Sequence, residues 1–162
     1  MPARPVVVNS TPLVAFWSIG RLDILRDLFG EIAVPPAVRE EFLSVERGER
    51  RKTLRESTWI RVIEVEHPNR VSVYAGLDEG EAQVLVLAEE QNASLVLIDE
   101  RKARRFAEKL NLPLSGTLGV LLLAKEEKII RAVAPLLKEM QHAGLYLHED
   151  LIEQVLNVAG EK

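Results

Sequence analysis

The sequence contains no cysteine, which excludes disulfide bonds and every zinc site that uses thiolate ligands. Its three histidines, His67, His142 and His148, lack the spacing of metal ligands, and we interpret them as surface or packing residues. No apolar run approaches the length needed to span a bilayer. Polar residues 9–12 break the apolar start of the chain and Arg21 soon follows, so we expect no signal peptide and a cytoplasmic protein.

Glycine-rich phosphate-binding loops and the serine-hydrolase nucleophile motif are also missing, as are internal repeats and low-complexity segments. Hydrophobic residues make up 47% of the 162 residues and charged residues 28%, which is the balance of a folded globular protein. The net charge of −4 gives no overall indication of nucleic-acid binding. The length favours one domain, which we expect to span residues 1–162.

Short buried strands alternate with helical segments along the chain. The predicted strands lie at 6–8, 32–34, 59–65, 94–99 and 112–116, and the predicted helices at 12–20, 22–29, 37–45, 46–57, 79–91, 100–110 and 117–128. Thr11 is expected to cap the first helix, with Pro12 as its first residue. This alternation is typical of a parallel sheet with helices on both faces, so we predict an α/β fold arranged as a three-layer α/β/α sandwich.

Two amphipathic helices are predicted from about residue 132 to the end, where they pack on this domain or form an interface. Their apolar stripes consist of Val133, Leu136, Leu137 and Met140, and of Leu151, Ile152, Val155 and Leu156.

Two of the predicted strands are followed by an oxygen-bearing side chain. Asn9 follows the strand at 6–8, and Asp99 closes the strand at 94–99. Ligands of open parallel sheets collect beyond the carboxyl ends of the strands, so both side chains are candidate ligand-binding groups. Alternatively, Asp99 caps the following helix and Asn9 bonds within its own turn.

Two glutamates interrupt apolar helix faces. Glu41 shares a face with Val38, Phe42 and Val45, and Glu81 shares one with apolar neighbours such as Val84. A carboxylate facing the core is costly unless it is paired or bound to a metal. The alternatives are that Glu41 extends to solvent at the edge of its stripe, and that Glu81 completes a capping box with the residue three positions earlier.

Together, Asn9, Glu41, Glu81 and Asp99 form a set of oxygen donors without histidine or cysteine. Hard cations such as Mg²⁺ or Mn²⁺ prefer such donors, and they can hold a phosphodiester and generate a hydroxide nucleophile. The turn "LSGT" is expected to bring Thr117 to the same edge of the sheet.

The order of these elements and acids resembles the PIN domain, the fold of the VapC-type toxin ribonucleases, and more narrowly a prokaryotic branch of PIN-like proteins. The matching stretches are "VVVNSTPLVAFWSIGRLDILRDLFG", "VPPAVREEF", "LDEGEAQVLVLAEE", "LVLIDERKARR", "SGTLGVLLLAKEEKII" and the tail "HAGLYLHEDLIEQVLNVAGE".

The resemblance implies a divalent-metal-dependent endoribonuclease, the toxin of a toxin–antitoxin pair, with RNA as substrate, a small antitoxin protein as partner and a homodimeric assembly. It assigns catalysis to Glu41, Glu81 and Asp99. The metal, Mg²⁺ or Mn²⁺, would be held by Asn9, Glu41, Glu81, Asp99 and Glu100, with Ser10 and Thr117 in support.

Asn9 departs from the family pattern, because most PIN nucleases carry aspartate there. Its carbonyl oxygen can still coordinate a cation, but the site then holds a charge of −3 rather than −4. Asn9 therefore favours an alternative hypothesis, a catalytically weakened or silent PIN-like module that binds RNA or protein. A third hypothesis, a purely structural interaction protein, predicts no stabilisation by divalent cations.

Two basic clusters are candidates for contact with RNA phosphates. The cluster directly after Asp99 consists of Arg101, Lys102, Arg104 and Arg105, and we assign it to RNA binding. The other consists of Arg47, Arg50, Arg51, Lys52 and Arg55, and it fits a solvated face with intermixed glutamates equally well.

Overall fold

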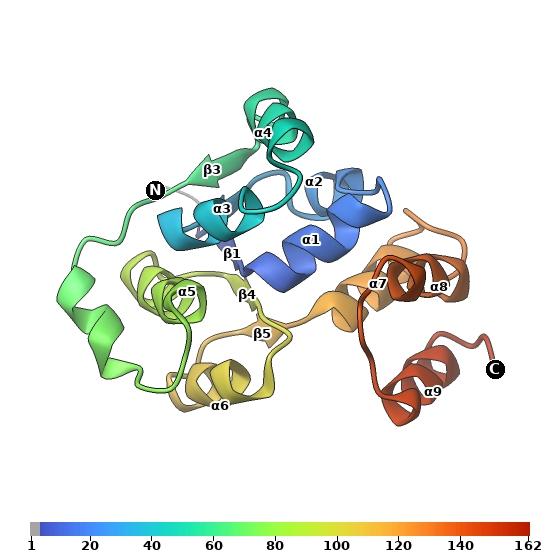
Figure 1. Cartoon of the computed structure of the whole chain (residues 1–162). Helices are drawn as coiled ribbons and strands as arrows, with labels where there is room; N and C mark the ends of the chain where they lie inside the picture. The colour runs from blue at the N-terminus through green and yellow to red at the C-terminus, as the bar shows by residue number, and fades with distance from the viewer. Residues whose placement is uncertain (1–3) are drawn as a thin grey trace.

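The computed structural model describes residues 4–162 and has a five-stranded parallel sheet at its centre (Figure 1). The strands are β1 (Val6–Val8), β2 (Ile32–Val34), β3 (Ile60–Val62), β4 (Leu95–Leu97) and β5 (Leu114–Ser115). Their order in the sheet is β3-β2-β1-β4-β5, and every neighbouring pair is parallel. The predicted α/β fold with a central parallel sheet is therefore confirmed.

Helices cover both faces of this sheet. The helices are α1 (Ser10–Ser18), α2 (Asp23–Phe29), α3 (Pro36–Phe42), α4 (Arg47–Glu56), η1 (Pro68–Val73), α5 (Glu79–Glu90), α6 (Arg101–Lys109), α7 (Thr117–Glu126), α8 (Ala134–His142) and α9 (Glu149–Val158). Helices α5 and α6 lie on one side of the sheet, and α1, α2 and α7 lie on the other (Figure 1). Helix α3 contacts both α1 and α5. None of the helices between residues 4 and 162 is long and apolar enough to cross a membrane.

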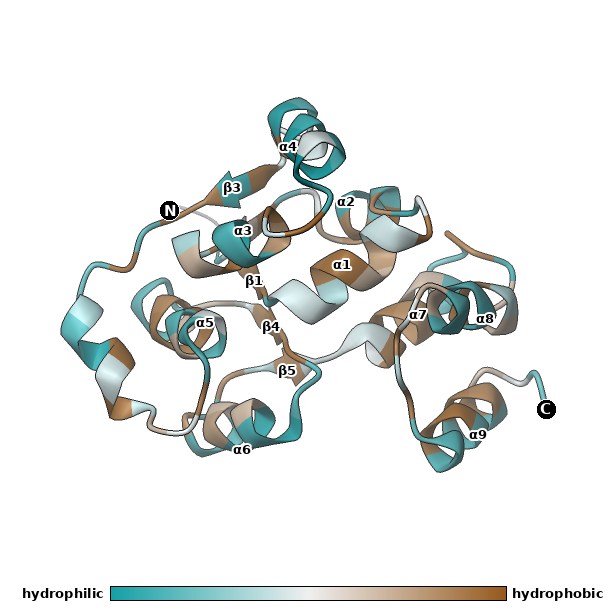
Figure 2. Ribbon diagram, in the orientation of Figure 1, coloured by the Kyte–Doolittle hydropathy of each residue, from teal (hydrophilic) through white to brown (hydrophobic). Residues whose placement is uncertain are grey.

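The core fills the space between the sheet and its helices. The strands β1 and β4 consist of apolar residues, whereas α4 consists mostly of hydrophilic ones (Figure 2). Val7, Phe16, Leu85 and Leu97 are fully buried. The β-branched runs that predicted the strands thus pack against the apolar faces of the helices, as expected for a parallel sheet.

Three local expectations were wrong. Helix α1 begins at Ser10, with Asn9 at the N-cap position, so Thr11 and Pro12 lie inside the first turn. Proline is tolerated there because the first turn has no intrahelical N–H bonds to lose. Helix α3 ends at Phe42 instead of continuing to Val45, whose side chain is 54% exposed.

The short 3₁₀ helix η1 was not predicted.

The two C-terminal helices pack on the rest of the chain to different extents. The stripe of α8 is buried as predicted, and α8 contacts α1. Helix α9 contacts α7 and buries Val155, but Leu151 is 45% exposed.

The carboxylate of Glu161 connects the chain end to the start of α8. It accepts hydrogen bonds from the backbone N–H groups of Val133 (2.7 Å) and Ala134 (2.9 Å), and from Lys125 Nζ (2.9 Å). Burial acts to raise the pKa of Glu161, but these donors outweigh it, so the net effect is a lowered pKa. Because the folded state favours the ionised form, the charge stabilises the fold.

We expect Glu161→Gln to lower the free energy of unfolding at neutral pH by about 1.5–3 kcal/mol, the range for hydrogen bonds to a charged group. The lowered pKa means that this advantage of the wild type is present above the ordinary glutamate pKa and is lost as pH falls through the folded-state value. Urea unfolding of both proteins across that acid range measures the difference. A difference that stays constant down to the lowest pH contradicts the assignment.

Candidate metal and nuclease site

The site is organised by the reversal of strand order between β1 and β4. These central strands are neighbours, although they lie far apart in the sequence, and Val8 is in register with Leu97. The backbone N–H of Asn9 donates to the carbonyl of Leu97 at 3.0 Å. The chain ends that carry Asn9 and Asp99 therefore leave the sheet side by side, at the edge where open parallel sheets bind ligands.

Asp99 is held by the turn between β5 and α7. Its Oδ1 accepts a hydrogen bond from the Thr117 N–H at 2.7 Å, and its Oδ2 accepts one from Thr117 Oγ1 at 2.5 Å. Arg104 donates from Nη1 to the carbonyl of Ile98 at 2.7 Å and so braces the end of β4. The expected proximity of Thr117 is confirmed. Asp99 does not cap α6, because that helix is capped by Glu100.

Gly116 allows Asp99 to approach this turn. A Cβ atom at Gly116 would lie 2.5 Å from Asp99 Oδ1, 3.1 Å from Arg104 Nη1 and 3.3 Å from the carbonyl oxygen of Ile98. The contact of 2.5 Å is too short for a carbon atom and the other two are tight, so glycine leaves room for the carboxylate in this position. The sequence motif "LSGT" contains this glycine, but nothing in the motif identifies Asp99 as the residue that it accommodates.

The side chain of Asn9 is 3% exposed, and its Oδ1 accepts no hydrogen bond from the described residues. A buried polar atom without a partner costs about 1–3 kcal/mol. The alternative in which Asn9 bonds within its turn is wrong, because the side chain makes no capping bond to α1. This oxygen is a donor atom that a cation or a water molecule would satisfy.

Glu41 lies close to the end of β1 through a contact with Ser10. Ser10 Oγ donates to Glu41 Oε2 at 2.8 Å. Glu41 itself is exposed, so the expectation that it faces the core was wrong. The alternative that Glu41 extends to solvent at the edge of its stripe is confirmed, because Val38 and Phe42 on the same helix are buried whereas Glu41 is exposed. A Cβ atom at Gly80 would lie 3.1 Å from Glu41 Oε2, so this glycine lets α5 approach the carboxylate.

Glu81 is buried, as predicted, and it completes a capping box with Asp78. Asp78 Oδ1 accepts from the Glu81 N–H at 2.7 Å, and Glu81 Oε1 accepts from the Asp78 N–H at 3.1 Å. Burial raises the pKa of Glu81, and the negative charges of Asp78, Glu100 and Glu41 raise it further, whereas the Asp78 N–H opposes the shift. The carboxylates of the site thus lie close enough to repel one another.

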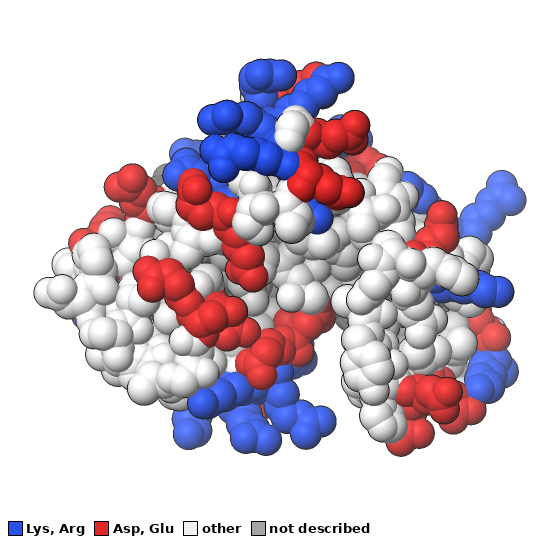
Figure 3. Space-filling model, viewed as in Figure 1, with Lys and Arg blue, Asp and Glu red and all other residues white. Residues whose placement is uncertain are grey.

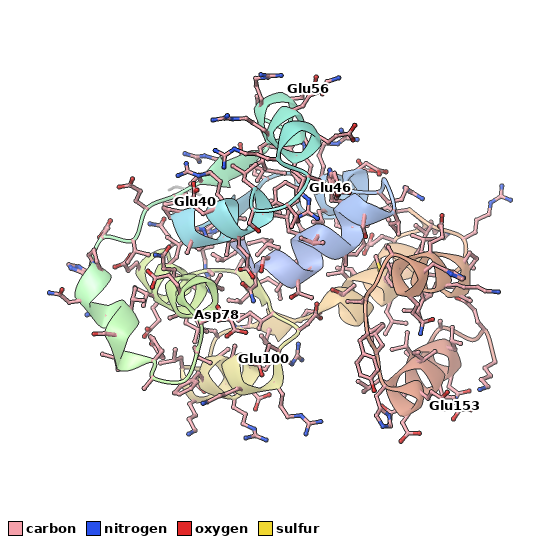
Figure 4. All side chains as sticks on the ribbon, in the orientation of Figure 1. Glu40, Glu46, Glu56, Asp78, Glu100 and Glu153 are labelled. Atoms are coloured by element: carbon pink, nitrogen blue, oxygen red, sulfur yellow. The ribbon has the colours of Figure 1, made fainter. Side chains whose placement is uncertain are left out.

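Acidic side chains form a continuous band on this face of the molecule (Figure 3). Glu40, Asp78 and Glu100 lie along it, whereas Glu153 lies apart on α9 (Figure 4). A pocket of about 560 Å³ opens within the band and is lined by Glu40, Glu41, Asp78, Glu79, Gly80, Gln83, Pro36 and Ala37. Sequence reasoning missed Glu40, Asp78 and Glu79 as lining residues, because their helix positions predicted only exposure or capping.

The predicted ligands share one face but do not converge. Across residues 4–162, no three acidic, histidine or cysteine side chains lie close enough together to hold a metal ion. Like-charged carboxylates repel one another, so each has a separate protein donor: Ser10 for Glu41, Asp78 for Glu81, and Thr117 for Asp99. The donor chemistry nevertheless fits a hard divalent cation, because carboxylates surround the pocket and Asn9 offers an unbonded amide oxygen.

The basic residues after Asp99 are on α6. Arg101, Lys102 and Arg105 are exposed, whereas Arg104 is half-buried through its bond to Ile98. Of the other cluster, Arg50 is buried and does not belong to any solvated surface.

Comparison with known proteins identifies the family. A family model described as a PIN domain matches residues 5–161, which is nearly the whole chain. No curated protein matches the chain. PIN domains are in general nucleases and typically use divalent metal ions.

We expect Gly116→Ala to displace the Asp99 carboxylate and lower the free energy of unfolding by roughly 1–3 kcal/mol, the usual penalty for overpacking. The matched control is Gly48→Ala, where a Cβ atom meets nothing within 4 Å. Thermal unfolding of the three proteins measures the effect. Equal melting temperatures for Gly116→Ala and the wild type would show that Asp99 is not held by this turn.

Proposed function

The chain belongs to the PIN-domain family, and from this membership we propose that it is a divalent-metal-dependent ribonuclease that hydrolyses phosphodiester bonds in RNA. The observation that carries the proposal is the unbonded, buried Oδ1 of Asn9 at the strand end beside that of Asp99. The next residue, Ser10, bonds to Glu41, which lines the acidic pocket. Buried polar atoms are as a rule satisfied by protein, by ordered water or by an ion, so the Asn9 oxygen is available to a bound cation.

Asn9, Glu41, Glu81 and Asp99 would hold the cation, with Glu100 as a further ligand. A bound Mg²⁺ or Mn²⁺ supplies a Lewis acid for the phosphoryl oxygens and lowers the pKa of water. Thr117 fixes the orientation of Asp99, and Ser10 steers Glu41 towards the end of β1. Burial is the main cause of the raised pKa of Glu81, and the repulsion by neighbouring acids adds to it; a bound cation would relieve that repulsion.

We further propose that the protein acts in the cytoplasm as the toxin of a toxin–antitoxin pair, as a homodimer that a small antitoxin protein inhibits. The support for these roles is the resemblance of the sequence to VapC-type toxins. A small open reading frame next to the gene, whose product co-purifies with this chain and blocks cleavage, is the expected finding.

We expect purified protein to cleave RNA with Mn²⁺, and Glu81→Gln and Asp99→Asn each to reduce the rate at least about a hundredfold, because several kcal/mol of transition-state stabilisation depend on the cation. The control is Glu153→Gln, which removes a charge on α9 away from the acidic band (Figure 4). Cleavage that survives in both site variants refutes the assigned residues.

A second candidate is the catalytically silent module that Asn9 favours, and Asn9→Asp separates it from a weakened nuclease. We expect the added charge to lower the melting temperature without divalent ions, because a buried carboxylate is costly. With Mn²⁺, we expect at least tenfold tighter binding, about 1.4 kcal/mol, and faster cleavage. Thermal shifts with and without Mn²⁺ measure the binding. Unchanged Mn²⁺ affinity with no cleavage in either protein supports the silent module.

A further inference from the structure

Helix α4 is docked onto the domain by a buried arginine. The Arg50 guanidinium lies 4.6 Å from the centroid of the Trp17 ring and 5.0 Å from that of Phe42, and its Nη1 donates to the Phe42 carbonyl at 2.9 Å. Trp17 Nε1 donates in turn to Thr53 Oγ1 at 3.1 Å. These contacts fix the inner face of α4, and its remaining cations therefore lie on the solvent side.

The outer surface of α4 carries Arg47, Arg51 and Arg55, which follow one another at every fourth position and are all exposed. We call these residues the α4 stripe. Helix α6 has the same arrangement in Arg101, Arg105 and Lys109, the α6 stripe, and these residues are also exposed. Residues four apart on a helix are neighbours, so each stripe aligns three positive charges about 6 Å apart along its helix.

Neither stripe is neutralised within the described part of the chain. None of the six cationic side chains of the two stripes forms an ion pair within residues 4–162. By contrast, Arg21, Arg39 and Arg61 each pair with a nearby acid. Like charges at this helical spacing destabilise a helix by about 0.2–0.5 kcal/mol per pair. Unpaired, aligned cations are therefore a small cost to folding that an anionic partner would offset.

The two stripes lie on opposite sides of the acidic band. Figure 3 shows positive side chains over α4 above the band and over α6 below it, on the same face of the molecule. A polyanion that contacts both helices must cross the acidic pocket, and the carboxylates there repel phosphate unless a divalent cation lies between them.

We propose that a single RNA strand crosses the acidic pocket from the α6 stripe to the α4 stripe, so that phosphates on both sides of the cleavage site are held. This proposal rests on the proposed function and adds to it the path of the substrate. It makes α4 a substrate-binding element, and it requires an RNA long enough to reach both helices.

The experiment measures the affinity of a fluorescein-labelled single-stranded RNA by anisotropy in Ca²⁺, with gel analysis to verify that the RNA stays intact. The test variant is Arg51→Glu with Arg55→Glu. The matched control is Arg131→Glu with Lys138→Glu, which makes the same change of charge at exposed positions at the start of α8 and on it.

We expect the α4 variant to bind the RNA at least tenfold more weakly and the control to stay within twofold of the wild type. The slope of log Kd against log salt concentration should fall by about 1.4 in the α4 variant, because each lost single-strand phosphate contact accounts for about 0.7. A shorter RNA that reaches only one stripe should lose less affinity in the α4 variant than the longer RNA does, because the intact α6 stripe can still bind it.

Equal affinities of the α4 variant and the control overturn the path. If the charge reversal unfolds the protein, Arg51→Gln with Arg55→Gln takes its place, with the same fall of about 1.4 in the slope for the longer RNA because the same two phosphate contacts are lost, and an unchanged slope overturns the proposal. If the wild type cleaves RNA and both α4 variants bind RNA as tightly as the wild type, the proposed nuclease function stands and only the proposed RNA path is refuted. If the wild type neither binds nor cleaves RNA, both the nuclease function and the RNA path are refuted.

Discussion

The pairing of β1 with β4 is the constraint on which the site depends. Strands from distant parts of the sequence meet at the centre of the sheet, and the bond from the Asn9 N–H to the Leu97 carbonyl extends the ladder past the end of β1. Because all five strands are parallel, their carboxyl ends lie at one edge, and the loops that follow must share it. Every other candidate residue reaches the site from a helix that packs against this pair or its neighbours.

Repulsion among the carboxylates of the acidic band lowers the stability of the fold, and hydrogen bonds to the individual carboxylates offset part of this cost. Each carboxylate has its own donor. Gly116 leaves room for Asp99, since a Cβ atom there would lie 2.5 Å from Oδ1, and Gly80 allows a close approach of Glu41, since a Cβ atom there would lie 3.1 Å from Oε2. Glu81 remains the most perturbed carboxyl of the band, with its pKa raised by burial and by three neighbouring acids. Groups arranged so that their charges repel are typical of sites that bind a cation or perform proton transfer.

The arginines of α4 have two different roles. One arginine, Arg50, is used as an internal anchor between Trp17 and Phe42, and the others remain outside without acidic partners in the described chain. A basic cluster that looked uniform in the sequence thus divides into one structural residue and a cationic surface. The acidic net charge of the whole chain conceals that surface, because the opposite charges are separated in space (Figure 3).

The sequence by itself determined the sheet, most of the helices and the family, because β-branched runs, caps and apolar stripes are local signals. Strand 32–34 and the capping box of Asp78 and Glu81 were predicted from such signals and are present in the structure. Only the tertiary structure decided that Asn9 is buried without a partner, that Glu41 is exposed, that Arg50 faces inward and that Asp99 is held by Thr117. These outcomes depend on how the helices pack and on contacts between residues far apart in the chain, and no periodicity within a single segment encodes them.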